Sequence, residues 1–404
     1  MSTSALAARI FLAFAFAYFF SALLRAVTAT LAPAFSAEFG LGAAELGLLA
    51  GAYFLGFAAL QLPLGRALDR IGPKKVLLGL LVLAVVGCAA FAMATQLWQL
   101  IVARALIGMG VAAGLMAPLT CYRARFSPPA QLRSNSWMLM TGSLGMLSST
   151  LPVQWLLPSW GWRGLFWAIA ALLLLAMAVI AMAVPADEVP DTQPGRAASG
   201  GYGAIVRHPV FVRSAPMGFF IYGGLIAVQA LWAGPWLTRV AGFDARQAAA
   251  GLFAINLSML FAFMSWGVVM PRLAARGIDA DRIMTWGAPA NLVLLAWIVL
   301  SPEPAGPATW AAWCVSCSVV SVSQPAVGQA FPREQAGRAL SAFNLVIFGG
   351  VFALQWGIGL GIDLAGFLGL GHAAAFRVTL AAFGLCCGAS YLFFLLKGRP
   401  KAGG

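Results

Sequence analysis

The strongest constraint on this 404-residue chain is a recurring run of about twenty apolar residues, the length that crosses a ~30 Å hydrocarbon core. Only 9% of the residues are charged, against roughly 25% in water-soluble globular proteins. Lipid offers the backbone no hydrogen-bond partners, and the runs do not alternate as barrel strands do, so each run is predicted to be a helix. The chain is therefore predicted to be an all-α polytopic membrane protein. Twelve transmembrane helices are expected near residues 8–33, 44–65, 76–95, 98–122, 135–157, 163–184, 211–237, 246–270, 283–301, 307–330, 339–362 and 374–396.

The formal net charge of +13 is explained by membrane topology rather than by a nucleic-acid partner. If the N-terminus is cytoplasmic and the chain crosses twelve times, 19 of the 25 Lys and Arg residues fall on the cytoplasmic side and four fall outside. This asymmetry follows the positive-inside rule. We expect a multi-pass protein of the cell inner membrane, surrounded by the lipid bilayer, with both termini cytoplasmic.

A tight basic loop joins the second and third apolar runs. Gly65 and Gly72 permit close helix approach and a sharp reversal, and Asp69 can lie against the positive N-terminus of a neighbouring helix. A loop of this composition can also serve only to fix topology. The order Gly65, Asp69-Arg70, Gly72 resembles the signature loop of the major facilitator superfamily, although Pro73 stands where that family usually has a basic residue.

The longest polar stretch, residues 185–208, is rich in proline and glycine and is predicted to be a cytoplasmic linker. It separates an N-terminal half, 1–184, from a C-terminal half, 209–404. Several pairs of residues recur at an offset near 203, which favours a duplication. These pairs are Phe126 and Phe331, Arg133 and Arg338, Gln154 and Gln355, and Trp155 and Trp356. The resemblance implies a superfamily-type bundle of two six-helix pseudo-repeats around a midplane site.

A second resemblance lies in the fourth run, where Arg104 is followed by Gly108 and Gly110. This spacing is similar to the fourth-helix signature of the same superfamily. Glycines four or fewer residues apart let two helices pack backbone to backbone. Gly108 is therefore predicted to help in conformational gating, together with Gly65, Asp69, Arg70 and Gly72.

Two arginines lie deep inside apolar runs, whereas all twelve carboxylates map to loops or helix ends. Burying an arginine in this way costs roughly 2.5 to 3.5 kcal/mol on insertion scales, which suggests a function. Arg25 and Arg104 should lie about 12 and about 9 Å below the outer helix ends, at similar heights. The resemblance implies that the first, fourth, seventh and tenth helices line a central cavity. Alternatively, Arg104 packs against backbone carbonyls as a structural strut, or an arginine extends toward the lipid headgroups.

Other polar side chains share helix faces with these charges. Helical spacing places Tyr18 on the same face of the first helix as Arg25. Buried amides and hydroxyls need partners that lipid cannot supply, so they favour a cavity. Aromatic residues at such positions are often only core packing. The further candidate binding residues are Tyr222, Gln229, Trp232, Gln324 and Asn344.

The leading hypothesis is a secondary active transporter that moves a small organic anion, a carboxylate above all, by alternating access. Positive charge without a fixed carboxylate selects a negative ligand, with Arg25 as counter-ion. The stretch from Arg25 to Pro33 is similar to the first helix of organic-anion symporters, although Leu24 replaces their acid. Asp69 is expected to latch near Ser341 in one state. The coupling species, a proton or a counter-anion, is left open.

The alternative function is a multidrug or metabolite exporter of the same superfamily. Such exporters commonly use a membrane-embedded acid, which this sequence does not supply. Enzymatic chemistry needs clustered His, Asp or Glu, and no such cluster lies at depth. We therefore expect no enzyme activity, no cofactor, no metal and no nucleic-acid partner, and we expect a monomer.

Overall fold

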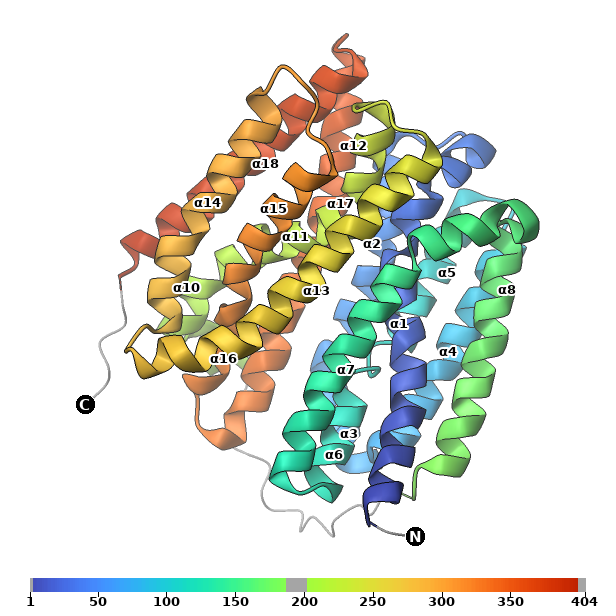
Figure 1. Ribbon diagram of the computed structural model, residues 1–404, viewed down its shortest axis with the longest axis vertical. Helices are drawn as coiled ribbons and strands as arrows, with labels where there is room; N and C mark the ends of the chain where they lie inside the picture. Colours follow the sequence, from blue (N-terminus) through green and yellow to red (C-terminus); the bar gives the residue numbers. More distant parts are fainter. Residues whose placement is uncertain (1–2, 187–201, 399–404) are drawn as a thin grey trace.

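The computed structural model describes residues 3–186 and 202–398, and within these ranges the chain is helical, without β-strands. Figure 1 shows the helices side by side in one bundle, with the first eight on the right and the later ones on the left. The N-terminal helices are α1 (Thr3–Phe39), α2 (Ala43–Ala59), α3 (Gln61–Ile71), α4 (Pro73–Met93), α5 (Leu97–Gly110), α6 (Met116–Arg125), α7 (Pro128–Ser148) and α8 (Leu151–Ala183).

The C-terminal part begins with two short helices, α9 (Tyr202–Arg207) and α10 (Pro209–Met217). The seventh predicted span continues through two π-helical turns, and the tenth contains a 3₁₀ turn. The remaining elements are η1 (Gly218–Tyr222), α11 (Gly223–Ala227), η2 (Val228–Trp232), α12 (Ala233–Arg239), α13 (Ala245–Ala275), α14 (Ala280–Leu300), α15 (Pro307–Cys317), η3 (Ser318–Val322), α16 (Ser323–Gln329), α17 (Arg333–Phe367) and α18 (His372–Leu396).

The twelve predicted spans all fall on these helices. Within the described residues, nine continuous helical segments are long and apolar enough to cross a membrane, and α2 with α3, bent by 45°, makes a tenth. The fourth span is broken between α5 and α6. The fifth consists of α7 and the first turns of α8, which then reverses at Gly161, where φ is +62°. Most of the predicted linker, 187–201, lies outside the described residues, so the division into two halves stays a prediction.

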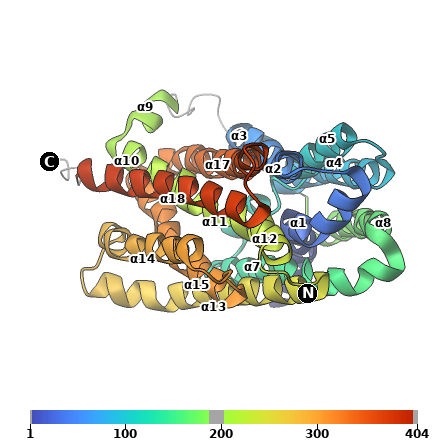
Figure 2. The same ribbon diagram turned by 90° about the horizontal axis from the view of Figure 1, so that it is seen from above.

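Both ends of the described chain lie on one side of the bundle. In the tilted view of Figure 1, α1 begins at the bottom of the bundle and α18 descends to end at its left edge, and we call this side the termini face. The opposite side, where α1 ends and α2 begins, is the distal face. Figure 2 shows the bundle from above, with α17 beside α2 and α3.

Basic side chains on the termini face cap the C-terminal end of α8. Arg9 donates to the Met182 carbonyl, Lys74 Nζ to the Ala181 carbonyl at 2.8 Å, and Arg125 Nη2 to the carbonyl of residue 186 at 2.6 Å. Unpaired carbonyls at a helix C-terminus carry partial negative charge, which these cations stabilise. Three of the positive charges predicted for this side therefore also tie three helices to α8.

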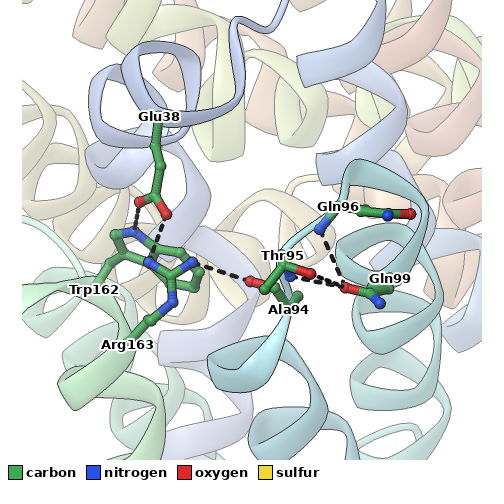
Figure 3. A network of polar contacts seen from close by, with 7 residues as sticks. All are labelled: Glu38, Ala94, Thr95, Gln96, Gln99, Trp162 and Arg163. Atoms are coloured by element: carbon green, nitrogen blue, oxygen red, sulfur yellow. Dashed lines mark hydrogen bonds and ion pairs between the residues drawn. The ribbon is translucent and has the colours of Figure 1, made fainter.

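A polar network on the distal face joins three helices of the N-terminal part (Figure 3). Glu38, near the end of α1, forms an ion pair of 2.6 Å with Arg163 and accepts a hydrogen bond of 2.6 Å from Trp162 Nε1. Arg163 Nη2 also donates to the Ala94 carbonyl at 3.0 Å, just before α5. The α1 end is thereby fixed to α8 and to the α4–α5 turn.

Glycines hold α5 against α2 at van der Waals distance. A Cβ atom added at Gly108 would lie 1.9 Å from the Tyr53 carbonyl oxygen, and one added at Gly56 would lie 2.1 Å from the Ala105 carbonyl oxygen. Both distances are far below contact, so these positions accept glycine only. The close helix approach predicted for the fourth run is present, and it occurs at Tyr53.

We therefore expect Gly108→Ala to lower stability by roughly 1 to 3 kcal/mol, because overpacking forces α5 away from α2. The matched control is Gly79→Ala in α4, where an added Cβ meets nothing within 4 Å. Thermal unfolding in detergent measures both variants. Equal melting temperatures for the two variants would contradict this packing.

Candidate functional site

Arg25 of α1 lies among three tyrosine side chains from three helical segments. The Tyr18, Tyr53 and Tyr222 side chains are close enough to its guanidinium to act on it electrostatically. Tyr18 and Tyr53 are buried, whereas Arg25 and Tyr222 keep part of their surface exposed. We call these four residues the Arg25 cluster. The cluster combines a reachable positive charge with fixed hydroxyl groups.

Aromatic rings form the apolar side of the Arg25 cluster. The guanidinium carbon of Arg25 lies 5.7 Å from the centre of the Phe57 ring. Phe57 in turn lies 4.6 Å from Phe348 of α17, measured between ring centres. Because α17 and η1 belong to the C-terminal part, elements from both parts of the chain surround the charge.

Arg104 lies behind Tyr53 and is 99% buried. Its Nη1 donates to the Leu24 carbonyl at 2.9 Å, and its guanidinium carbon lies 5.0 Å from the centre of the Tyr53 ring. Leu24 directly precedes Arg25 in α1. Arg104 of α5 therefore lies at about the same height as Arg25. The Nε and Nη2 atoms of Arg104 are buried without a hydrogen-bond partner among the described residues.

The Arg25 cluster contains no acid. The ion pairs that the structure describes include Arg163–Glu38 on the distal face and Arg213–Asp281, which joins α10 to the start of α14. Neither involves Arg25 or Arg104. Uncompensated positive charge at low dielectric attracts an anion strongly. The same described ranges hold no group of three or more His, Cys, Asp or Glu that could bind a metal ion.

Four other predicted residues are bonded within the C-terminal part. Gln229 Nε2 donates to Asn256 Oδ1 at 2.9 Å, and Trp232 Nε1 donates to the Gln355 carbonyl at 3.2 Å. Gln324 Nε2 donates to Asn344 Oδ1 at 2.8 Å. Gln229 and Trp232 are buried, and substrate contact by any of these side chains stays a prediction.

Of the residues predicted to gate the molecule, Gly108 packs against Tyr53, whereas those of the basic loop and Ser341 lie toward the termini face. Gly72 has a φ of +96° between α3 and α4, a conformation that requires glycine. Asp69 and Arg70 are exposed and make no hydrogen bond or ion pair with the described residues, and Ser341 is partly buried. The predicted contact between Asp69 and Ser341 is therefore not formed in this conformation.

Sequence reasoning missed Tyr53, Phe57 and Phe348 as members of the site. Tyr53 carried a usable signal, since it is one of only six tyrosines and lies within an apolar run. The two phenylalanines carried none, because the chain has 28 of them and their side chains also fill lipid-facing and core positions. Only the contact between α2 and α17 brings these two rings together.

The chain belongs to the Major Facilitator Superfamily, whose family model matches residues 14–354. Membership of this superfamily supports a secondary transporter rather than an enzyme. Its all-helical fold is the twelve-helix fold of the superfamily.

Curated relatives match over limited stretches. The 4-hydroxybenzoate transporter PcaK of Pseudomonas putida is 33% identical over 154 residues, which is 37% of this chain and 33% of the relative. The gentisate transporter of Corynebacterium glutamicum is 25% identical over 167 residues, 40% of this chain and 37% of the relative. The inner membrane transport protein YajR of Escherichia coli is 30% identical over 149 residues, 36% of this chain and 32% of the relative. The chain thus matches about a third of each relative's length.

Solved structures share the fold over nearly the whole chain. A bacterial homologue of the human lysosomal transporter Spinster, in an inward-facing and unoccupied conformation, has a TM-score of 0.78 at 16% identity and covers 97% of each chain. The D-xylose-proton symporter has a TM-score of 0.73 at 14% identity and covers 96% of each chain. At these identities the likeness concerns the fold.

We expect Tyr53→Phe to lower the free energy of unfolding by about 0.5 to 1.5 kcal/mol, because the Tyr53 hydroxyl donates to the Ser21 carbonyl at 3.2 Å. The matched control is Tyr122→Phe, because the Tyr122 hydroxyl is buried without a partner among the described residues. Removing that hydroxyl should leave stability unchanged or raise it. Thermal unfolding measures the stability of both variants. A loss of stability confined to Tyr122→Phe would contradict the stabilising role of the Tyr53 hydrogen bond.

Proposed function

We propose that this transporter moves a small organic anion that carries a carboxylate, with the Arg25 guanidinium as its counter-ion. The observation that carries the proposal is a partly exposed arginine inside the bundle with no acid among the described residues to neutralise it. A charge in that setting is stable when a ligand supplies the opposite sign.

The Arg25 cluster suits a carboxylate chemically. The planar guanidinium offers paired N–H groups that match the two oxygens of a carboxylate. The Tyr18 and Tyr222 hydroxyls can donate to the same anion or accept from a hydroxyl on the substrate. Phe57 and Phe348 provide ring surfaces beside the charge, which favours an aromatic acid.

The relatives support the same substrate class. Two of them are named for 4-hydroxybenzoate and gentisate, both hydroxylated aromatic carboxylates. The exporter alternative is less well supported, because the described carboxylates lie in loops or toward helix ends and none accompanies Arg25. A cationic drug would meet an unopposed positive charge.

Arg104 serves this proposal as a positioning residue. Its bond to the Leu24 carbonyl fixes α1 one residue before Arg25, and its guanidinium faces the Tyr53 ring. A substrate that reached Arg104 would have to displace Tyr53, which is fully buried. Arg104 therefore holds the wall of the site, and Arg25 meets the anion.

Transport would proceed by alternating access, with the two halves rocking about the Arg25 cluster. The positive-inside asymmetry supports a cell inner membrane location with the termini face cytoplasmic. Since no acid accompanies Arg25, a coupling proton would travel on the substrate, or exchange against a counter-anion would supply the energy. A monomer contains all the residues of the site.

We expect Arg25→Gln to reduce uptake of an accepted aromatic carboxylate at least tenfold, because a charge-assisted hydrogen bond contributes about 1.5 to 3 kcal/mol. Arg25→Lys keeps the charge but loses the paired geometry, so it should retain an intermediate rate. Uptake and counterflow in proteoliposomes across a panel of aromatic and aliphatic carboxylates measure the effect.

The matched control is Arg377→Gln on the distal face, where the exposed side chain only donates to the Pro302 carbonyl at 3.0 Å. This variant should transport normally. Undiminished uptake of every accepted anion by Arg25→Gln would reject the role of Arg25. Uptake of neutral sugars or organic cations alone would reject the substrate class.

A further inference from the structure

The exposed carboxylate of Asp363, near the end of α17, caps the first turn of α2. Asp363 Oδ1 accepts from the Ala43 amide at 3.0 Å, and Oδ2 accepts from the Ala44 amide at 2.7 Å. These amides are among the four that a helix start leaves unpaired, and they carry partial positive charge. The contact is unusual because the cap comes from the other half of the molecule, 319 residues away.

Below this cap, α2 and α17 pack closely because small residues face the partner backbone. A Cβ atom added at Gly47 would lie 2.2 Å from the Gln355 carbonyl oxygen, and one added at Gly359 would lie 2.3 Å from the Ala43 carbonyl oxygen. Arg239 Nη2, at the end of α12, also donates to Ser36 Oγ of α1 at 3.1 Å across the same face. The distal face is therefore closed.

The two helices run antiparallel, and toward the termini face their glycines no longer touch the partner helix. Ser341 and Gly337 lie on the same face of α17 as Phe348, Gly359 and Asp363, nearer to the start of the helix. A Cβ atom added at Gly337, or at Gly65 of α3, would meet nothing within 4 Å. Small residues at this end thus face open space, whereas those at the distal end are packed.

The α17 helix and the bent span formed by α2 and α3 each carry an aspartate near the C-terminal end. Asp363 of α17 is bonded to the start of α2, whereas Asp69 of α3 is exposed and makes no hydrogen bond or ion pair with the described residues. Because α3 is joined to α2 at a bend of 45°, rocking that brings Asp69 to the first turns of α17 would pull Ala43 away from Asp363.

We propose that Asp363 is the distal latch of this transporter, the counterpart of Asp69, and that the two aspartates cap their partner helices in alternate conformations. The distal latch holds the molecule closed on the distal face while the termini face is open. This proposal depends on the transporter fold and not on the identity of the substrate. It can therefore hold even if the assignment of an organic anion fails.

The test measures the distance across the distal face by double electron–electron resonance. Spin labels are placed at Ser159→Cys and Glu303→Cys, both exposed on the distal side, after Cys386, the exposed member of the described cysteines, is replaced by serine. Asp363→Asn removes the charge. It should raise the ratio of distal-open to distal-closed molecules about two- to fivefold, the range expected for one exposed charge at a helix N-terminus.

Two further variants keep the test sharp. Ala43→Pro removes the Ala43 amide, which is one of the two donors to Asp363. The first position of a helix tolerates proline, and the variant should raise the distal-open population as Asp363→Asn does. Asp244→Asn is the matched control, because Asp244 Oδ1 accepts from the Gln247 amide at 2.7 Å within its own half. It should leave the distance distribution unchanged.

If the two aspartates act in alternate conformations, substitution of Asp69 should change the distal-open population in the direction opposite to Asp363→Asn. Asp69→Asn should lower the distal-open population, because it weakens only the conformation in which the termini face is closed. Unchanged distances in both Asp363→Asn and Ala43→Pro, or an equal shift in Asp244→Asn, would overturn the distal latch. A rise in the distal-open population of Asp69→Asn would overturn the pairing of the two aspartates.

Discussion

The constraint on which this structure depends is the positive charge of Arg25, held inside a helical bundle without a carboxylate beside it. Lipid cannot solvate such a charge, so the bundle must orient polar groups toward it or leave it open to a ligand. Tyr18, Tyr53 and Tyr222 are the polar groups near this charge. The partial exposure of Arg25 leaves it accessible to a ligand. Neutral hydroxyls stabilise the guanidinium without cancelling its charge, which leaves its attraction for an anion intact.

The surrounding packing serves to keep that arrangement rigid. Gly108 lets α5 touch the backbone of α2 at Tyr53, and Arg104 joins the Tyr53 ring to the Leu24 carbonyl. Tyr53 is thus fixed on one side by backbone contact and on the other by a buried cation. If Arg104 were instead a second counter-ion for the substrate, its guanidinium would have to be accessible. It is buried behind Tyr53.

Much of the fold could be predicted from the sequence, because lipid permits few solutions for a run of twenty apolar residues. Arg25 and Arg104 were identifiable because a charge in such a run is costly. Tyr53 and Phe348 were not, since their importance arises from which helices touch, and helical spacing within one segment does not report that. The break of the fifth span near Ser149 was also missed, although the sequence carries a signal for it, because Ser148, Ser149 and Thr150 are followed by Pro152, which is typical of the first turn of a new helix.

The Arg25 charge and the two carboxylates proposed as latches lie at different depths of this molecule. Arg25 lies inside the bundle, where low dielectric strengthens its attraction for a ligand, and Asp69 and Asp363 are exposed near helix ends. If Asp363 or Asp69 stood beside Arg25, it would neutralise the site and compete with the substrate. Asp363 instead caps a helix N-terminus, as Asp69 is proposed to do in the alternate conformation, and the weak attraction of such a cap suits contacts that must form and break in each cycle. Under these proposals binding and gating use separate charges, and neither has to be weakened for the other to work.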